Sequence, residues 1–241
     1  KAVLGLISHD SGDIKLMGKS PSELREAEKE KIGVTLAESG FSGYLKVKDI
    51  VPVMAAMYPR FDRERFLSLC RKFSIPQDKY IKEFSTGMKA KLKVLAAVTH
   101  NAAFLLLDEP TTGLDITARE SILDLFRGYM EEDESRSILI SSHISSDLEG
   151  LCDDIYIIHE GKIVLHEDMD NLLNEYGLIK ADNGQYARLD KEHILSIRRT
   201  PFGYECLTDQ KGYYKENYPD IVVENGSLDE AITMMTGGER L

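Results

Sequence analysis

The apolar residues of this chain alternate between two patterns. Short continuous apolar runs, such as FLLL at 104–107 and SILISS at 137–142, are typical of strands buried on both faces of a parallel sheet. Between such runs, as at 116–131, apolar residues recur three and four positions apart, which predicts amphipathic helices. Strands that alternate with helices predict an α/β fold with a mostly parallel sheet.

The first hundred residues predict a helical insertion between two strands. One buried strand is expected at 31–36, the next is the FLLL run, and the residues from about 38 to 100 between them have a helical pattern. Asp62 and Ser85 are the expected N-caps of two of these helices. The elements expected here are an apolar helix end at 1–7, a strand at 13–17, and helices at 22–31, 47–58, 63–73 and 86–98.

Residues 166–241 predict a small α+β appendage that follows a first domain at 1–165. A helix at 145–152 and a hairpin at 154–164 precede it, and beyond them the pattern weakens. The elements expected in this last part are helices at 169–176 and 228–236, the second capped by Ser227, β-like segments at 187–189, 193–198 and 204–207, and polar NG turns at 183–184 and 225–226.

Composition limits the class of protein. Of the 241 residues, 42% are apolar and 29% charged, as in an ordinary globular protein, and no apolar run approaches the roughly 18 residues of a membrane span. The net charge of −11 disfavours broad contact with nucleic acid. Three cysteines without metal-ligand spacing favour reduced thiols in a cytosolic protein: Cys70, Cys152 and Cys206.

The segment FLLLDE at 104–109 places two carboxylates where a predicted strand ends. Pro110 cannot continue the strand, so Asp108 and Glu109 lie at its carboxyl end, where open α/β sheets bind their ligands. One carboxylate there can bind a hard cation such as Mg²⁺, while its neighbour orients or deprotonates a water molecule. The alternative is a strand that merely ends in an acidic turn, and the two residues alone do not exclude it.

A second segment, FSTGMKAKL at 84–92, opens a predicted helix at a Ser-Thr-Gly step. Backbone N–H groups at the positive end of a helix dipole favour a phosphate, although an ordinary N-cap followed by glycine is the alternative. The order of segments argues against that alternative. This helix start is followed by the predicted strand FLLLDE at 104–109, by GLD at 113–115, and by a predicted strand that is followed by Ser-His at 142–143.

Together these segments resemble the nucleotide-binding domain of ATP-binding-cassette (ABC) proteins, over roughly residues 1–165. FSTGM at 84–88 corresponds to the family's signature sequence, 104–109 to its Walker B strand, 113–115 to its D-loop and His143 to its switch histidine. The resemblance implies a P-loop NTPase-like fold that binds ATP and Mg²⁺ and hydrolyses ATP.

The resemblance also implies a role for each residue at the strand edge. Asp108 would bind Mg²⁺ through water, Glu109 would polarise the attacking water, and His143 would reach the γ-phosphate. Glu109 and His143 are therefore the expected catalytic residues.

Domains of this family work as head-to-tail dimers, which implies a second nucleotide-binding subunit as a partner. Ser85 and Gly87, together with Thr86 and Met88, would bind the nucleotide held by that partner, and Asp115 would contact the partner. Thr86 and Met88 stand where the family usually has Gly and Gln.

Two further differences between this sequence and the family's motifs concern the nucleotide site. No Walker A sequence, G-x-x-x-x-G-K-[ST], occurs in the 241 residues, so we expect it upstream of Lys1 in a longer protein, and expect the 241 residues alone to be inactive. Ala37 and Glu38 stand where the family has its Q-loop glutamine; Glu38 could supply an acidic substitute, but the methyl side chain of Ala37 cannot bind metal.

The segment KVKDIVPVMAAMYPRFDRERF at 46–66 resembles the helical subdomain of ABC-2-type exporter ATPases. The resemblance implies a cytoplasmic ATPase subunit, peripheral on the inner face of the cell membrane, that serves a separate membrane permease as a homo- or heterodimer. Four residues are candidates for the permease contact, although their spacing equally fits a buried stripe: Val53, Met54, Met57 and Tyr58.

Two other functions are weighed against this one. A non-transport ABC ATPase acting on ribosomes or DNA is disfavoured by the acidic charge and by the absence of a second cassette or long coiled coil. A catalytically impaired regulatory or interaction module would explain the missing Walker A sequence, but Glu109 and His143 are both present, which argues against it.

Overall fold

The FLLLD run forms the central strand of a parallel sheet. In the computed structural model, β2 (Phe104–Asp108) lies between β1 (Ile32–Thr35) and β3 (Ser137–Ser141), and both pairings are parallel. Leu105 and Leu106 point to opposite faces of this strand and are 0% and 9% exposed, which confirms that the strand is buried on both faces. The predicted α/β fold with a parallel sheet is therefore confirmed.

The structure describes residues 1–36 and 40–240, which separate into two compact units, 1–143 and 144–241. The sequence places a domain boundary near residue 165 instead. The difference arises because the elements after His143 contact one another: α10 packs on α6 and on β5, and α7 packs on β5.

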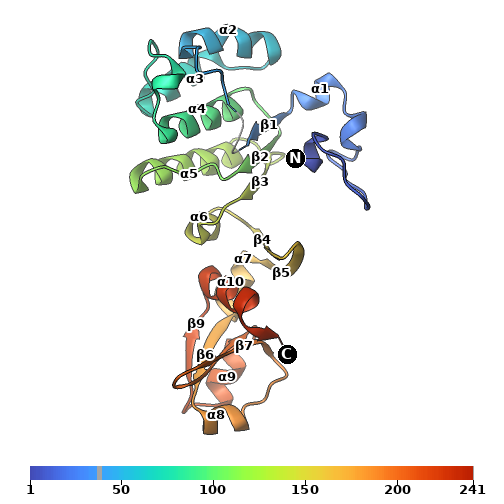
Figure 1. Cartoon of the computed structure of the whole chain (residues 1–241), viewed down its shortest axis with the longest axis vertical. Coiled ribbons are helices and arrows are strands. Elements are labelled where there is room, and N and C mark those ends of the chain that lie inside the picture. The colour runs from blue at the N-terminus through green and yellow to red at the C-terminus, as the bar shows by residue number, and fades with distance from the viewer. Residues whose placement is uncertain (37–39, 241) are drawn as a thin grey trace. The chain divides into compact units, whose positions relative to one another are not determined.

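The helical insertion between β1 and β2 is confirmed. Asp62 and Ser85 accept hydrogen bonds from the third residue of their helices, as N-caps do, through Oδ1 and Oγ. In Figure 1, α2 and α3 lie beyond α4 on the side away from α5 (Ile116–Glu131). The elements of the insertion are α2 (Val47–Met57), α3 (Arg63–Lys72), η3 (Ile81–Glu83) and α4 (Thr86–Thr99).

The core of the first unit lies where α4 and α5 meet the sheet. Leu95 of α4 and Phe126 of α5 are fully buried. Tyr129 is also fully buried, and its hydroxyl donates to the carbonyl oxygen of Ala102 at 2.7 Å. Apolar contacts and this satisfied polar group fix both helices against the strands.

Two expectations for the first unit are wrong. Residues 13–17 form no strand, only an isolated bridge between Leu16 and Lys19, because Gly12 and Gly18 turn the chain in the left-handed conformation. The strand at 137–142 is not buried: Leu139 is 51% exposed, and within the described part of the chain β3 is an edge strand that pairs with β2. The N-terminal segments expected as helices are short: η1 (Ala2–Leu4), η2 (Pro21–Glu23) and α1 (Glu26–Lys29).

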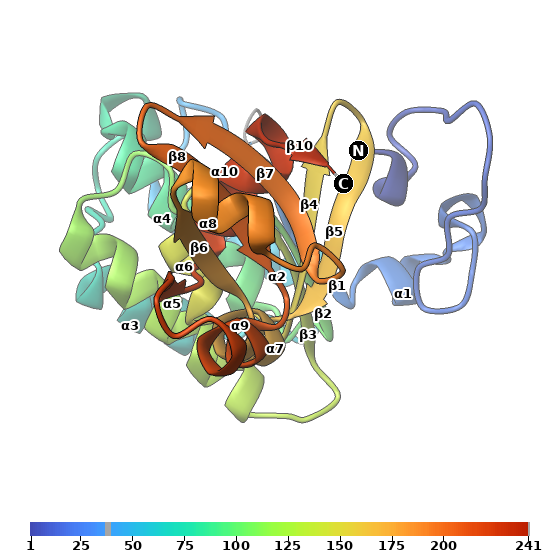
Figure 2. The same ribbon diagram turned by 90° about the horizontal axis from the view of Figure 1, so that it is seen from below.

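The second unit is an α+β structure built on a five-stranded antiparallel sheet in the order β10-β7-β8-β6-β9. Figure 2 shows α8 across β6 and β8. Its elements are α6 (Ser145–Glu149), the hairpin β4 (Asp154–His159) and β5 (Lys162–Asp168), α7 (Met169–Glu175), β6 (Gly177–Ala181), α8 (Asn183–Arg188), β7 (Ile194–Thr200), β8 (Gly203–Thr208), α9 (Lys211–Asn217), β9 (Val222–Asn225), α10 (Leu228–Gly237) and β10 (Glu239–Arg240).

Part of the second unit follows the sequence pattern, two expected segments differ, and β6, α8, α9 and β9 were not expected from the sequence. The hairpin, β7, β8 and α10 with its Ser227 cap are confirmed. The β-like segment expected at 187–189 and the NG turn at 183–184 instead lie in or next to α8, because Asp182 and Gln185 form a capping box that starts a helix there. In neither unit is a described helix long and apolar enough to cross a membrane.

The three cysteines are free thiols, and we predict that they are protected in the native protein. Burial raises the pKa of Cys70 and Cys206 to about 12 and that of Cys152 to about 11, so little thiolate is present at pH 8. Alkylation followed by mass spectrometry should therefore be at least about tenfold slower in the native protein than in urea. Equal rates would contradict this packing.

Candidate functional site

Asp108 is the last residue of β2, and its position is set by strand register. The parallel pairing places Asp108 opposite Ser141 at the carboxyl end of β3. The Ser141 hydroxyl donates to Oδ1 of Asp108 at 2.8 Å. The side chain that the sequence assigns to Mg²⁺ is therefore held at the sheet edge by the neighbouring strand.

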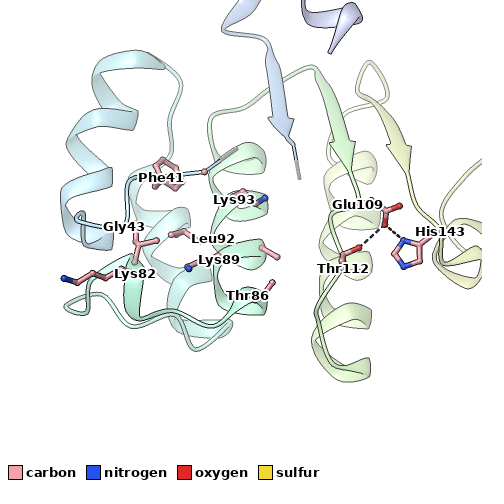
Figure 3. A pocket seen from close by; sticks show the side chains of 13 residues that line it. Phe41, Gly43, Lys82, Thr86, Lys89, Leu92, Lys93, Glu109, Thr112 and His143 are labelled. Carbon is pink, nitrogen blue, oxygen red and sulfur yellow. Dashed lines mark hydrogen bonds and ion pairs between the residues drawn. The ribbon is translucent and has the colours of Figure 1, made fainter. Parts of the chain in front are cut away.

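Glu109 follows directly and leaves the strand with a backbone φ of 49°, in the left-handed region that non-glycine residues rarely adopt. Its N–H donates to the carbonyl oxygen of Ser141 at 3.0 Å. Its Oε2 accepts from the Thr112 hydroxyl at 2.9 Å and lies 2.7 Å from Nδ1 of His143, as Figure 3 shows. The two residues predicted to be catalytic are thus in direct contact.

This contact determines which nitrogen of His143 can act on a ligand. An ionised carboxylate only accepts hydrogen bonds, so Nδ1 carries the proton that it donates to Glu109. The other ring nitrogen, Nε2, then donates only when the ring is protonated. The imidazole side chain is 67% exposed and the Glu109 carboxylate 28%, so both are accessible to a ligand and to water.

The amino end of α4 contacts the loop after β2. The Ser85 hydroxyl oxygen accepts from the Met88 N–H at 3.2 Å, which leaves its own proton to donate. A Cβ atom added to Gly87 would lie 3.0 Å from the carbonyl oxygen of Gly113, and one added to Gly113 would lie 3.2 Å from Cγ2 of Thr86. The signature and D-loop segments therefore pack together within this one chain.

Asp115 has a structural role in this chain. It is the N-cap of α5, where its Oδ1 accepts from the Ala118 N–H at 2.9 Å. The same carboxylate also adds negative charge at the positive end of the helix dipole. Any contact of Asp115 with a second subunit would add to this capping.

A cavity of about 780 Å³ brings these parts together. Thr86 from the start of α4 lines it, and so do Glu109 and His143 from the sheet edge. Figure 3 shows these side chains facing a common space from α4 on one side and from the strand ends on the other. The cavity is wide enough for a ligand of nucleotide size.

Three residues near this cavity were not singled out from the sequence. Ser141 and Thr112 hold the two carboxylates, and Lys93 of α4 lines the cavity. Lys93 had a detectable signal, since it is a lone cation within the apolar run LKVLAAV. Ser141 could be found only from the strand register. Ala37 and Glu38, at the Q-loop position, lie outside the described residues.

A parallel sheet with carboxylates at its carboxyl edge and an inserted helical layer defines an α/β domain whose ligand site lies at the strand ends. The sequence profile of the ABC transporter family matches residues 1–112. The lantibiotic transport ATP-binding protein SrtF of Streptococcus pyogenes is 33% identical over 176 residues, which cover 72% of this chain and 74% of that protein.

Two other comparisons indicate the same family. The ABC transporter ATP-binding protein YtrB of Bacillus subtilis is 28% identical over 98% of this chain and 82% of its own length. A solved ATP-binding subunit of an ABC transporter has the same fold, with a TM-score of 0.63 at 23% identity over 71% of this chain and 72% of its own. The chain belongs to the ATP-binding proteins of ABC transporters. It is therefore an ATP-binding and ATP-hydrolysing subunit.

The close approach of Gly87 to Gly113 generates a prediction about stability. In Gly87→Ala the new methyl group would press on the Gly113 carbonyl, so the free energy of unfolding should fall by about 1 kcal/mol or more. Gly128→Ala is the matched control, because nothing lies within 4 Å of a Cβ atom added at this position in α5. The free energy of unfolding of that variant should rise by about 0.5–1 kcal/mol. Urea denaturation measures both, and a stabilised Gly87→Ala would contradict the packing described.

Proposed function

We propose that this ATPase subunit drives export of a substrate through a separate membrane permease, and that Glu109 and His143 are its catalytic pair. The observation that carries the proposal is the 2.7 Å contact between these side chains in a cavity that the signature segment also lines. The names of the relatives support the transport role, since SrtF is described as a lantibiotic transport protein.

The hydrolytic step assigns one task to each group. A water molecule attacks the γ-phosphorus, the bond to the bridging oxygen of ADP breaks, and Glu109 accepts the proton that the water loses. Thr112 and His143 hold the carboxylate of Glu109 in place for this. Once protonated, His143 would donate from Nε2 to a γ-phosphate oxygen, where negative charge develops.

The residues at the sheet edge fit Mg²⁺ as a cofactor. Mg²⁺ prefers oxygen ligands, keeps several waters, and binds through one or two carboxylates together with substrate phosphates. The described residues hold no group of three or more His, Cys, Asp or Glu that could hold a metal ion, but Asp108 with its Ser141 partner supplies the oxygen ligand that water-mediated binding needs. When bound, Mg²⁺ would neutralise charge on the phosphates.

A second nucleotide-binding subunit would complete the site. Ser85, with a hydroxyl proton to donate, and the N–H groups at the start of the 14-residue helix α4 suit a phosphate oxygen of a nucleotide held by the partner. Thr86 and Ser85 are both exposed. ATP between two such subunits would close the dimer, and hydrolysis would reopen it.

The permease would contact the outer face of α2, with the subunit on the cytoplasmic side of the membrane. Of the four candidate residues, Val53 and Met57 are 45% and 59% exposed, whereas Met54 belongs to the core at 5%. The ring of Tyr58 contacts that of His100 in a tilted arrangement, with ring centroids 4.2 Å apart. Val53 and Met57 therefore remain the candidates for the contact.

We predict that Glu109→Gln lowers ATP turnover of the full-length protein by about 10²–10⁴, because an amide cannot accept the proton from water. Nucleotide binding should persist, since Gln keeps the shape of the side chain. Thr112→Val, which removes only one supporting hydrogen bond, should have a smaller effect. Turnover of Glu109→Gln at the wild-type rate would contradict the assignment of the base.

We also predict that charge on the exposed face of α2 weakens permease binding. Val53→Asp combined with Met57→Asp should abolish co-purification with a co-expressed permease subunit, while basal ATP turnover is kept. Phe202→Asp, at a 91% exposed position in the other unit, is the control and should bind normally. Equal loss in both variants would argue against this contact surface.

A further inference from the structure

Two Asn-Gly steps lie in the second unit, and the function proposed above uses neither. Asn183 and Gly184 begin α8, whereas Asn225 ends β9 and Gly226 follows it. In such a step the backbone nitrogen of glycine can attack the side-chain amide carbon of asparagine, because glycine has no side chain to block the approach. Both asparagines are exposed, so access to water does not distinguish them. The backbone around each glycine does.

The backbone nitrogen of Gly226 is held by the fold. Its N–H donates to the carbonyl oxygen of Tyr176 at 2.9 Å, and a Cβ atom added to Gly226 would lie 2.9 Å from the same carbonyl group. Asn225 pairs with Gly177 across the sheet, and its Oδ1 accepts from Nζ of Lys215 at 3.3 Å. An attack at this step therefore requires the end of β9 to separate from β6, which breaks several contacts at once.

The backbone nitrogen of Gly184 is not held in this way. Gly184 is the second residue of α8, and the first four N–H groups of a helix have no partner within the helix. Within residues 1–36 and 40–240, neither its N–H nor the side-chain amide of Asn183 has a hydrogen-bond partner. Because α8 has only six residues and helix ends fray, its first turn can open while the strands stay paired.

We propose that Asn183 is a deamidation site of the native protein, whereas the fold protects Asn225 in the same dipeptide. The nitrogen of Gly184 forms a bond to Cγ of Asn183, and the side-chain nitrogen leaves as ammonia with the proton that the Gly184 nitrogen loses. Water then adds to either carbonyl carbon of the resulting succinimide, and the C–N bond at that carbon breaks. The product is aspartate or isoaspartate, according to which carbon the water attacks.

The two products have different effects on α8. Aspartate keeps the main chain intact and adds negative charge at the positive end of the helix dipole. Isoaspartate lengthens the main chain by one methylene group, which disrupts the capping box of Asp182 and Gln185. Nε2 of Gln185 also donates to the carbonyl oxygen of Asp220 at 2.8 Å, so the loop before β9 would lose a contact as well.

The test follows both sites in the same sample. Native and urea-unfolded protein are kept at mildly alkaline pH and digested at acidic pH at intervals, and conversion at each asparagine is measured by peptide mass spectrometry. In urea the two sites should react within about threefold of each other, because only the neighbouring sequence then matters. In the native protein Asn225 should react at least about tenfold more slowly than Asn183.

Asn183→Gln and Asn225→Gln are matched variants, because glutamine keeps the amide but cyclises far more slowly. Ammonia release from the native protein should fall by about twofold or more in Asn183→Gln and stay at the wild-type rate in Asn225→Gln. Melting temperatures show that both variants are folded. Equal native rates at the two sites, faster reaction at Asn225, or ammonia release unaffected by Asn183→Gln would overturn the proposal. None of these measurements involves ATP, so their outcome is independent of the proposed function.

Discussion

The parallel pairing of β2 with β3 is the constraint on which the site depends. Its register sets Asp108 opposite Ser141, and the Ser141 side chain and carbonyl then hold Asp108 and Glu109 in turn. Side chains alternate between the faces of a strand, so a slip of one residue would turn every side chain to the opposite face. The sheet therefore positions both carboxylates before any ligand arrives.

The helical insertion contributes the other wall of the cavity. Its helix α4 packs on the sheet through a buried apolar face, and its first turn meets the loop after β2 at Gly87 and Gly113. Because backbone and side chain meet so closely there, the start of α4 and the loop after β2 form one closely packed contact. Lys93 joins the same helix to the end of β1, so a single element carries both the signature segment and a charge at the strand edge.

The second unit is stabilised differently from the first. Its antiparallel sheet is supported by a core that includes Ile179, Cys206 and Tyr214, all fully buried. Two of its elements, α9 and β9, have sequences too polar and too short for their pattern to reveal them. They form because neighbouring strands and the core supply the missing apolar surface, which is information that no local window contains.

The sequence by itself determined the buried central strand, the helical insertion, both tested caps of its helices and the family of the protein, because each depends on local periodicity or on motif spacing. It could not determine that β3 is half-exposed, since a continuous apolar run looks alike at the centre and at the edge of a sheet. Only the tertiary structure decided which side chains meet. The contacts of Ser141 with Asp108, of His143 with Glu109 and of Lys93 with Leu36 join residues more than thirty positions apart, and strand register and helix packing create them.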